Sequence, residues 1–593
     1  MVSEGFSISF RQPPRQEPLQ ELWAVDEHRL FVAGERMCVL RTTRDPVRAA
    51  LVGRAFGSSL THCRRFATLD EHAARLASVL GAQDQGYIRR ALKALCDQGL
   101  MVNHRQLFER QHFSAPPTSE PPAATFIRSR HRVPELERLL GECWEKYGPR
   151  RPFVVVDDSE DVVATEGNRA VCDAMAARGL NVRLSGRMAW EESCAGEDLG
   201  AERELVHWLL LGGPNSGGGS YGAALNRVLL LSAGRRAFLL DDDAHLAAYS
   251  AQAMDKPAAI TMSGQPYRDR FLPPDALLSD GFEPLTIDPL AEHEALLGHT
   301  IGSCLKPRES QWRELARGLD PVTLDRLDDQ SSVRLTVNGV LGDSGAPSNL
   351  RLFLADPESL GRAAHSDDQF RKLARNHSVW RGRDATNLSS VNVLTATTLV
   401  GIDNHSIVPP VLPEGRGEDY LFSAVLEFLY PGAFIAELPW ALLHAPERQR
   451  IYDRGLFEKP FVPSSTQILA EGIRSQARYC RARDPGRRLE DLSETIEGWA
   501  RLHETEFRQL WEEIVVTARA ALLGQLEKSQ RRHAQSAASV RADVQRLIEL
   551  NGNFGRETLA SHDLGHVRSV WGRYSQALKI WPSLWSRHHD SGQ

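Results

Sequence analysis

The ten residues AFLLDDDAHL, Ala237 to Leu246, place three consecutive aspartates directly after four apolar residues. The apolar run predicts a buried strand. Three carboxylates so close together repel one another, and they are stable only where solvent, a cation or hydrogen-bond donors compensate their charge. The stretch therefore predicts a strand that ends at a binding site.

Strand-like and helix-like patterns alternate in the sequence before this stretch. The predicted strands are ATFIRSR, PFVVVDD, NVRLSG and RAFLLDDD, and the predicted helices are VPELERLLGECWEKYG, NRAVCDAMAARG and YGAALNRVLLLSAG. This alternation predicts the α/β class, with an open, mostly parallel, Rossmann-like sheet covered by helices. Ligands of such sheets bind at the carboxyl ends of the strands, where PFVVVDD and RAFLLDDD both place aspartates.

The chain has 593 residues, which is too long for one ordinary core. SAPPTSEPPAA, residues 114–124, has the composition of a linker, so residues 1–113 are expected to form a separate small α+β domain. The sheet domain is expected to span residues 125–463, with a long insertion at about 256–400. Residues 464–593 show helical periodicity and are expected to pack on this domain or to join two copies of the chain.

The composition excludes several classes of protein. A net charge of −6 provides no global attraction to nucleic acid or to an anionic membrane. The sequence contains no apolar run of about 18 residues and no signal-peptide pattern at its start, so we expect a cytoplasmic protein without a transmembrane segment. The eight cysteines are scattered and contain no C-x-x-C, which is typical of reduced thiols.

The first hundred residues combine two predicted helices, LDEHAARLASVLG and YIRRALKALCDQG, with a short apolar strand after Gly99. This order resembles a winged-helix domain, including the small modules that bind leader peptides in peptide-modifying enzymes. The resemblance implies that this domain holds a peptide or protein, and a docking or scaffolding role is the alternative. DNA binding is disfavoured because the second helix offers few cations to phosphates, namely Arg89, Arg90 and Lys93.

Five motifs occur in order between Thr125 and Arg450. They are TFIRSRHRVPELERLL, FVVVDDSED, GGSYGAALNRVLLLSAGRRAFLLDDD, GRGEDYLF and LPWALLHAP. Together they resemble the GT-A glycosyltransferases, especially the inverting family 2 with its D-x-D motif. The resemblance implies a metal-dependent glycosyltransferase, of the hexosyltransferase type, that uses a nucleotide-diphosphate sugar. UDP-sugars are favoured as donors, and the acceptor is a peptide or protein, a glycan or a small metabolite.

The resemblance also implies roles for the aspartates of the central stretch. Asp241 would face the ribose and approach the metal, Asp242 would lie in the same nucleotide site, and Asp243 would ligate the metal together with His444. The growing negative charge on a diphosphate leaving group calls for a divalent cation. Mn²⁺ and Mg²⁺ both accept carboxylate ligands, and a histidine ligand favours Mn²⁺.

The remaining site residues come from the flanking motifs. Asp158, with Asp157 as the second choice, would accept a hydrogen bond from the base of the nucleotide. Asn226 and Arg227 precede the D-x-D strand and have either a nucleotide-binding or a structural role. Asp419 would be the catalytic base of an inverting displacement, with Glu418 in support.

The chain departs from the family pattern at two places. The distance from Asp243 to Glu418 is longer than usual, and the first strand ends in RSRHR, whose Arg128 and Arg130 are structural or touch the nucleotide.

Other interpretations remain open. The D-x-D after an apolar strand also occurs in haloacid-dehalogenase-type phosphohydrolases, although position 245 is His here. A nucleotidylyltransferase and a GT-A-like protein that binds without catalysis are further alternatives. The aspartates could also cap a helix over AHLAAYSAQAM. The protease-like motif at Asp343 and Ser344, with His62, is interpreted as a coincidence, because a trypsin-like protease needs two β-barrels.

Overall fold

The computed structural model places most of the chain. It describes residues 21–43, 47–110, 122, 124–196, 202–213, 221–251, 260–262, 267–272, 281–306, 311–317, 319–325, 327, 331–345, 350–354, 360, 366–375, 378–390, 398–446, 460–477, 479–533, 536, 538–553 and 563–591. Most of the predicted linker, residues 114–124, lies outside these ranges.

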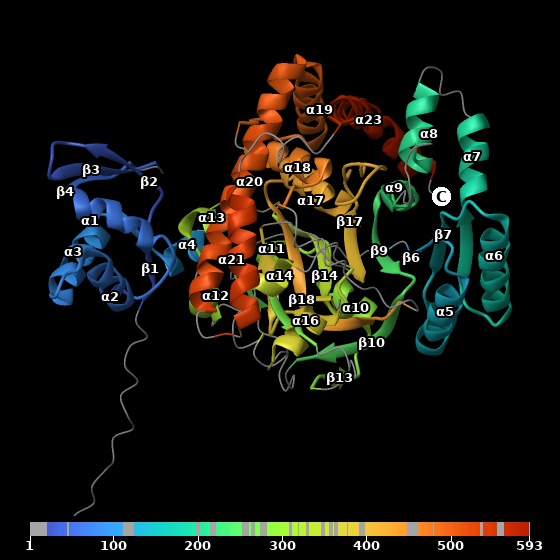
Figure 1. Cartoon of the computed structure of the whole chain (residues 1–593), viewed down its shortest axis with the longest axis horizontal. Coiled ribbons are helices and arrows are strands. Elements are labelled where there is room, and N and C mark those ends of the chain that lie inside the picture. The colour runs from blue at the N-terminus through green and yellow to red at the C-terminus, as the bar shows by residue number, and fades with distance from the viewer. Residues whose placement is uncertain are drawn as a thin grey trace, which may run out of the picture. The chain divides into compact units, whose positions relative to one another are not determined.

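The chain forms two compact units. The first unit comprises residues 1–112, 262–264 and 305–328, and the second comprises residues 113–261, 265–304 and 329–593. Figure 1 labels their elements. None of the described helices is long and apolar enough to cross a membrane.

The first unit combines short strands with helices. Its elements are β1 (Trp23–Val25), β2 (His28–Val32), β3 (Met37–Thr42), β4 (Ala49–Gly53), α1 (Arg54–Ser59), the 3-10 helix η1 (Leu60–Cys63), α2 (Leu69–Leu80), α3 (Gln85–Asp97), β5 (Met101–Asn103), α4 (His104–Arg110), α12 (Trp312–Ala316) and α13 (Pro321–Asp325). A capping box between Thr68 and Glu71 starts α2, and Gly81, with φ 63°, ends it. The predicted order of two helices, Gly99 and a strand is confirmed.

Two antiparallel sheets hold the first unit together. β2, β3 and β4 form one sheet, and β1 pairs with β5. The sequence pattern of LWAVDEHRLFVA suggests that its two strands pair with each other, which is wrong. β1 pairs with β5 because the strand after Gly99 returns along it, so that Val25 lies opposite Met101.

Residues far along the chain complete the first unit. The ring of Trp312 in α12 stacks on that of Phe108 in α4, with centroids 5.1 Å apart. The backbone N–H of Phe66 donates to the carbonyl of Leu319 at 2.7 Å. The first unit therefore combines residues 1–112 with segments, 262–264 and 305–328, that lie about 150 to 200 residues further along the sequence.

The second unit contains a large sheet and its covering helices. Its strands are β6 (Ala124–Ser129), β7 (Phe153–Asp157), β8 (Val182–Gly186), β9 (Arg235–Asp241), β10 (Ala244–Ser250), β11 (Ile260–Thr261), β12 (Arg268–Phe271), β13 (Glu283–Leu285), β14 (Ser332–Asp343), β15 (Ser378–Gly382), β16 (Thr386–Ser389), β17 (Leu399–Asn404) and β18 (Ala433–His444). Its helices are α5 (Val133–Tyr147), η2 (Gly148–Arg150), α6 (Val162–Ala177), α7 (Arg187–Gly196), α8 (Arg203–Leu211), α9 (Tyr221–Leu231), α10 (Pro289–Glu294), α11 (Ile301–Leu305), α14 (Leu350–Leu354), α16 (Asp367–Arg375), α17 (Glu418–Leu429), α18 (Ser465–Gln476), α19 (Pro485–Arg501), α20 (Glu504–Arg532), α21 (Ala538–Gly552) and α23 (Leu564–Ser591).

The sheet has the order β11-β16-β18-β14-β17-β9-β6-β7-β8, with β10, β12, β13 and β15 attached at its side. Within it, β18, β14, β9, β6, β7 and β8 run in one direction, and β17 is antiparallel to its neighbours. The predicted α/β class with a large, mostly parallel sheet is confirmed. The sheet is central because both of its faces are covered.

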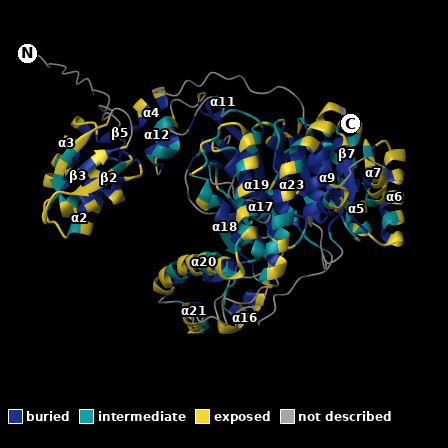
Figure 2. Ribbon diagram, turned by 90° about the horizontal axis from the view of Figure 1, so that it is seen from above, coloured by how far each residue is buried: buried dark blue, intermediate teal, exposed yellow. Residues whose placement is uncertain are grey.

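Successive residues of β6 belong to different cores. Phe126 packs in the core that α8, α9 and α17 share, whereas Ile127 packs in the core beneath α5. Figure 2 shows buried residues concentrated over α9 and β7, while the outer faces of α5, α6 and α7 are exposed. Burial on both faces explains the near-continuous apolar runs FVVV and AFLL.

The C-terminal helices belong to the same core as the sheet. Their buried members include Ile468, Leu492, Trp511, Trp571 and Trp581. The predicted helical character of the C-terminal region is confirmed for its described part.

These helices also hold the loop that follows β17. The hydroxyl of Tyr574 donates to the carbonyl of Pro410 at 2.9 Å, and the indole N–H of Trp581 donates to that of Val408 at 2.6 Å. This loop leads into α17, so α23 fixes the start of that helix.

Candidate functional site

Polar side chains follow the carboxyl ends of the parallel strands. Asp158 follows β7, Asp241 ends β9, Asp343 ends β14 and His444 ends β18. Because these strands run in one direction, their ends meet at one edge of the sheet.

The chain reverses its progress across the sheet beside β6. It proceeds from β6 to β7 and β8 on one side, and then places β9 on the other side of β6. This is a topological switch point, where ligands of open α/β sheets bind. Arg128 and Asp241 lie opposite each other in the β6–β9 pairing, directly at this point.

Arginines from the end of β6 and from the turn after it compensate the three aspartates. Arg128 donates from Nη2 to Asp241 Oδ1 at 2.9 Å. The Nη1 of Arg132 donates to Asp242 Oδ1 at 2.9 Å and to Asp243 Oδ2 at 2.6 Å. Asp242 and Asp243 are buried, and burial raises the pKa of Asp242 to about 7 against the nearby charge of Arg132. The guanidinium groups thus stabilise like charges that would otherwise repel.

His444 approaches Asp243 from the other end of the sequence. Its Nε2 lies 2.9 Å from Asp243 Oδ1, and its Nδ1 lies 2.5 Å from the carbonyl oxygen of Asp343. Burial would lower the pKa of His444, but the hydrogen bond and charge of Asp243 outweigh it and raise that pKa to about 9. Burial would raise the pKa of Asp243, but His444 and Arg132 hold it well below its usual range.

This geometry determines the orientation of the imidazole. A carbonyl oxygen can only accept, so Nδ1 of His444 carries the proton and Nε2 faces a carboxylate oxygen. Two acceptors at this distance require a proton or a metal ion between them, and the raised pKa of His444 favours a second ring proton in the protein without metal. Metal-ligating histidines often donate their other ring N–H to a backbone carbonyl, as His444 does here.

The fit to a divalent cation rests on two protein ligands. Among the residues that the structure describes, no group of three His, Cys, Asp or Glu side chains lies close enough to hold a metal. The side chains of Asp243 and His444 do converge. Divalent cations such as Mg²⁺ commonly use one or two protein ligands together with substrate phosphates and water. The residues present therefore fit such an ion. Asp241 is paired with Arg128 instead.

Asp158 lies between two arginines at the end of β7. Arg227, which is fully buried in α9, donates to its Oδ1, and Arg187 at the start of α7 donates to the same atom at 3.2 Å. Burial lowers the pKa of Arg227 against the charge of Asp158. Asp158 thus has the compensating charges that a buried carboxylate requires.

Asp157 and Asn226 use their side chains mainly for hydrogen bonds that hold neighbouring segments of the protein together. Asp157 Oδ1 accepts from the backbone N–H of Ser159 at 2.9 Å and from Asn168 Nδ2 at 3.1 Å. Asn226 donates to the carbonyls of Leu209 and Val411, and accepts from the N–H of Val411 at 2.6 Å. The amide of Asn226 thus joins α8, α9 and the loop before α17.

Glu418 and Asp419 occupy the first turn of α17. The helix starts after Gly417, whose φ of 90° places it in the left-handed region. Asp419 Oδ1 accepts from the backbone N–H of Tyr420 at 2.8 Å. Partial burial and the neighbouring Glu418 raise the pKa of Asp419 to about 7, while the charge of Arg128 opposes this change. Arg128, the partner of Asp241, thus also acts on the acidic pair of α17.

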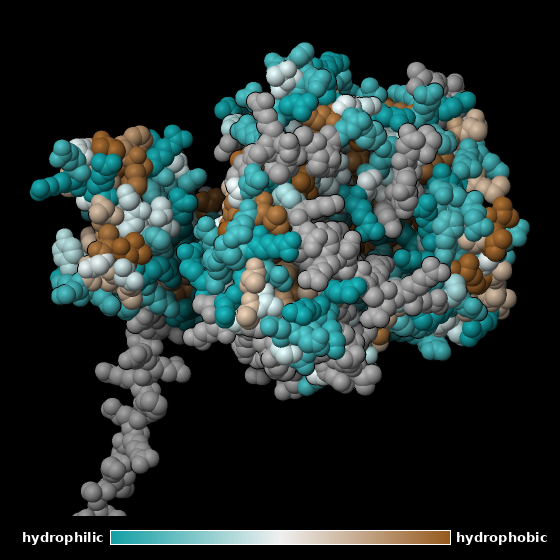
Figure 3. All heavy atoms as spheres, in the orientation of Figure 1, coloured by the Kyte–Doolittle hydropathy of each residue, from teal (hydrophilic) through white to brown (hydrophobic). Residues whose placement is uncertain are grey.

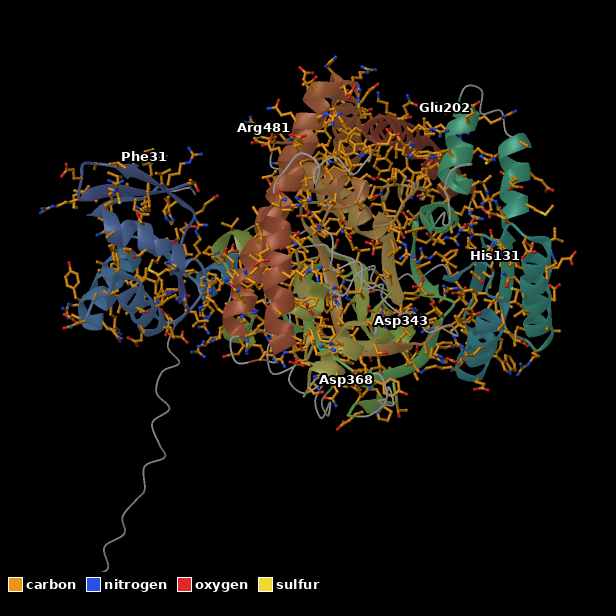
Figure 4. All side chains as sticks on the ribbon, in the orientation of Figure 1. Phe31, His131, Glu202, Asp343, Asp368 and Arg481 are labelled. Atoms are coloured by element: carbon orange, nitrogen blue, oxygen red, sulfur yellow. The ribbon has the colours of Figure 1, made fainter. Side chains whose placement is uncertain are left out.

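Some residues of this site were not singled out from the sequence. Arg132, Arg187 and the carbonyl of Asp343 all contact predicted site residues. The run RSRHR, Arg128 to Arg132, carried a signal for Arg132, because three arginines at the end of a central strand need acidic partners. Figure 4 labels His131 in this run and Asp343 at the end of β14.

Two competing interpretations of the sequence can be compared with the fold. The segment after the three aspartates is not a helix but the strand β10, so they are not a helix cap. His62 lies in the 3-10 helix η1 of the first unit, whereas Asp343 ends β14 in the second unit and Ser344 follows it. The elements around these residues differ from those of a protease barrel.

The first unit carries apolar side chains on its surface. Phe31 and Leu51 are 48% and 61% exposed and lie on either side of Val39 in the β2-β3-β4 sheet. Arg29 and Arg41 form the neighbouring cross-strand pair on the same face. Figure 3 shows apolar atoms at the surface of this unit, where Figure 4 labels Phe31.

The chain matches no family model, and no curated protein matches its sequence significantly.

Proposed function

We propose that the protein is a GT-A-type glycosyltransferase that moves a sugar from a nucleoside-diphosphate donor to an acceptor hydroxyl. The observation that carries this proposal is the meeting of Asp243 and His444, 2.9 Å apart, where Asp243 follows β9, one of the strands that flank the switch point. The two come from different motifs of the glycosyltransferase resemblance.

A divalent cation, Mn²⁺ in preference to Mg²⁺, would be held by Asp243 and His444. When bound, it neutralises negative charge on the diphosphate leaving group. Asp158 accepts a hydrogen bond from the base, and an N–H donor of the uracil type suits this acceptor. A UDP-sugar is therefore the proposed donor.

Asp419 accepts the proton of the acceptor hydroxyl as that oxygen attacks the anomeric carbon. Its pKa of about 7 suits a general base at neutral pH. Arg128 pairs with Asp241 on the donor side of the site. Its positive charge also interacts with the carboxylates of Glu418 and Asp419 on the acceptor side, so Arg128 connects the two sides electrostatically.

The acceptor is proposed to be a peptide or protein held by the first unit. The apolar pair Phe31 and Leu51, with Arg29 and Arg41 beside it, would favour a segment with apolar and acidic side chains.

Calorimetric titration with UDP, GDP, CDP and ADP, with and without Mn²⁺, tests the proposal. We expect one diphosphate to bind with Mn²⁺, and we expect Asp243→Asn to weaken this binding by at least about tenfold. Asp403→Asn is a matched control, because Asp403 is also buried and paired with an arginine, Arg334 at 3.1 Å, but lies in the antiparallel strand β17. Absence of binding by all four nucleotides, or equal effects of the two substitutions, contradicts the proposal.

A further inference from the structure

Arg132 occupies a different position from the other arginines of its run. Arg128 pairs with Asp241, and Arg130 pairs with Glu160 at 3.1 Å. Arg132 instead contacts Asp243, the carboxylate that also faces His444. The three arginines therefore share no acidic partner, and Arg132, which contacts both Asp242 and Asp243, is the one that contacts the proposed metal ligand.

The side chain of Arg132 is more exposed than its acidic partners. It is 32% exposed, whereas the carboxylates of Asp242 and Asp243 are 6% and 4% exposed. The residue directly precedes α5 and makes no capping hydrogen bond there. Its guanidinium thus reaches from solvent towards two buried carboxylates and neutralises them in the protein without a cation.

We propose that Arg132 is an exchangeable counter-ion of Asp243, which a divalent cation must displace in order to bind. This inference rests on the proposed function, because it takes Asp243 and His444 as ligands of the cation. Both oxygens of Asp243 have partners, Oδ1 in His444 and Oδ2 in Arg132. A dication that approaches this carboxylate therefore competes with the guanidinium and is repelled by it.

A nucleoside diphosphate changes this balance, because it brings a new anion to the switch point. The displaced guanidinium then has a partner, since arginine binds phosphate oxygens well. Cation and nucleotide must consequently bind cooperatively, and each must strengthen the binding of the other by the same factor.

Binding of Mn²⁺ to the full chain can be measured by the electron paramagnetic resonance signal of the free ion, with and without UDP. We expect the wild type to bind Mn²⁺ weakly alone and about tenfold more tightly with UDP. Arg132→Ala should bind Mn²⁺ about tenfold more tightly than the wild type without UDP, and UDP, whose phosphates still ligate the ion, should then strengthen this binding less than it does in the wild type. Arg130→Ala is the matched control and should behave as the wild type does, because its partner is Glu160.

Arg132→Lys covers the case in which the alanine variant does not fold. A lysine keeps the charge but lacks the planar guanidinium and its five donors, so we expect Mn²⁺ affinity between those of the wild type and Arg132→Ala. Unchanged or weaker Mn²⁺ binding by a folded Arg132 variant overturns the inference. A failure of the proposed function looks different, because UDP and the other diphosphates would then bind to no variant, while the Mn²⁺ affinities without nucleotide would still be compared.

Discussion

The imidazole of His444 and the carboxylate of Asp243 meet at 2.9 Å, although 201 residues separate them in the sequence. β10 brings them together, because it returns from the three aspartates along β18 and places Ala244 opposite His444. On the other side of His444, Gly342 of β14 allows the backbone of His444 to approach closely. A Cβ atom at Gly342 would lie 2.3 Å from the carbonyl oxygen of His444.

The His444–Asp243 pair predicts a pH-dependent stability. The pKa of His444 is raised from about 6.5 to about 9 in the folded protein, so the pair contributes fully below pH 6.5 and its contribution is lost as the pH rises through 9. With a chelator present, we expect the wild type to lose up to about 3 kcal/mol more than His444→Gln between pH 6.5 and 9.5. Urea unfolding of both proteins at several pH values measures this difference. Parallel curves for the two proteins would contradict the prediction.

Asp419 predicts the acidic limb of the pH–rate profile. Its pKa is raised to about 7, and a general base must be deprotonated, so kcat/KM should fall tenfold per pH unit below about pH 7. Asp419→Asn should lower kcat by about 10²- to 10⁴-fold. Steady-state rates from pH 5 to 9 provide the test, once an acceptor is known.

Glu418→Gln is the informative companion of that experiment. Glu418 raises the pKa of Asp419, so its neutralisation should move the acidic limb to lower pH while activity at pH 8 is kept. A limb that stays in place with Glu418→Gln, or persists in Asp419→Asn, would show that another group is the base.

Asn226 predicts a loss of stability without a loss of nucleotide binding. Asn226→Ala leaves the carbonyls of Leu209 and Val411 and one N–H without their hydrogen bonds, which costs about 3 kcal/mol. Urea unfolding measures this loss, and titration with the nucleotide that binds the wild type measures the affinity, which should change by less than about twofold. Weaker nucleotide binding by a fully stable variant would instead assign Asn226 to the binding site.

The stacking of Trp312 on Phe108 predicts that the stability of the first unit depends on the segment that contains Trp312. Trp312→Ala removes the ring that stacks on Phe108 and should destabilise the first unit by about 2 kcal/mol. Hydrogen exchange in α2, α3 and α4 should accelerate, whereas exchange in β6, β7 and β9 of the second unit should not change. Trp312→Phe, which keeps a stacked ring, is the control. Equal exchange rates in Trp312→Ala and wild type would contradict the prediction.

The sequence predicted those parts of the fold that local patterns determine. The strands β6, β7, β8 and β9 and the helices α5, α6 and α9 have their own periodicity and turn residues and were recognised, whereas α7 and α8 were not. The segment after the three aspartates was open to a helical interpretation and is the strand β10, because its partners β13 and β18 are distant in sequence. Pairing of this kind leaves no local signal.

The site, like the fold, was predictable only where local sequence patterns reveal its residues. The aspartates were found because charges at the end of an apolar strand are costly, and the proximity of His444 to Asp243 was expected only through the resemblance. Arg132 and Arg187 were missed because arginines are common on protein surfaces. Only the register of β6 and β9 and the position of α7 bring them to buried acids.

The first unit contains segments that are far apart in the sequence, and this has a consequence for the synthesis of the chain. On the ribosome, residues 21–110 emerge early, but Trp312 and Leu319 are added only after the four strands β6 to β9 have been made. The first unit therefore cannot finish folding when its N-terminal part has been translated. Its nascent form waits for a segment about 200 residues downstream, and contacts of such long range form slowly. During that interval, the face of α4 that Trp312 will cover stays accessible to chaperones and proteases.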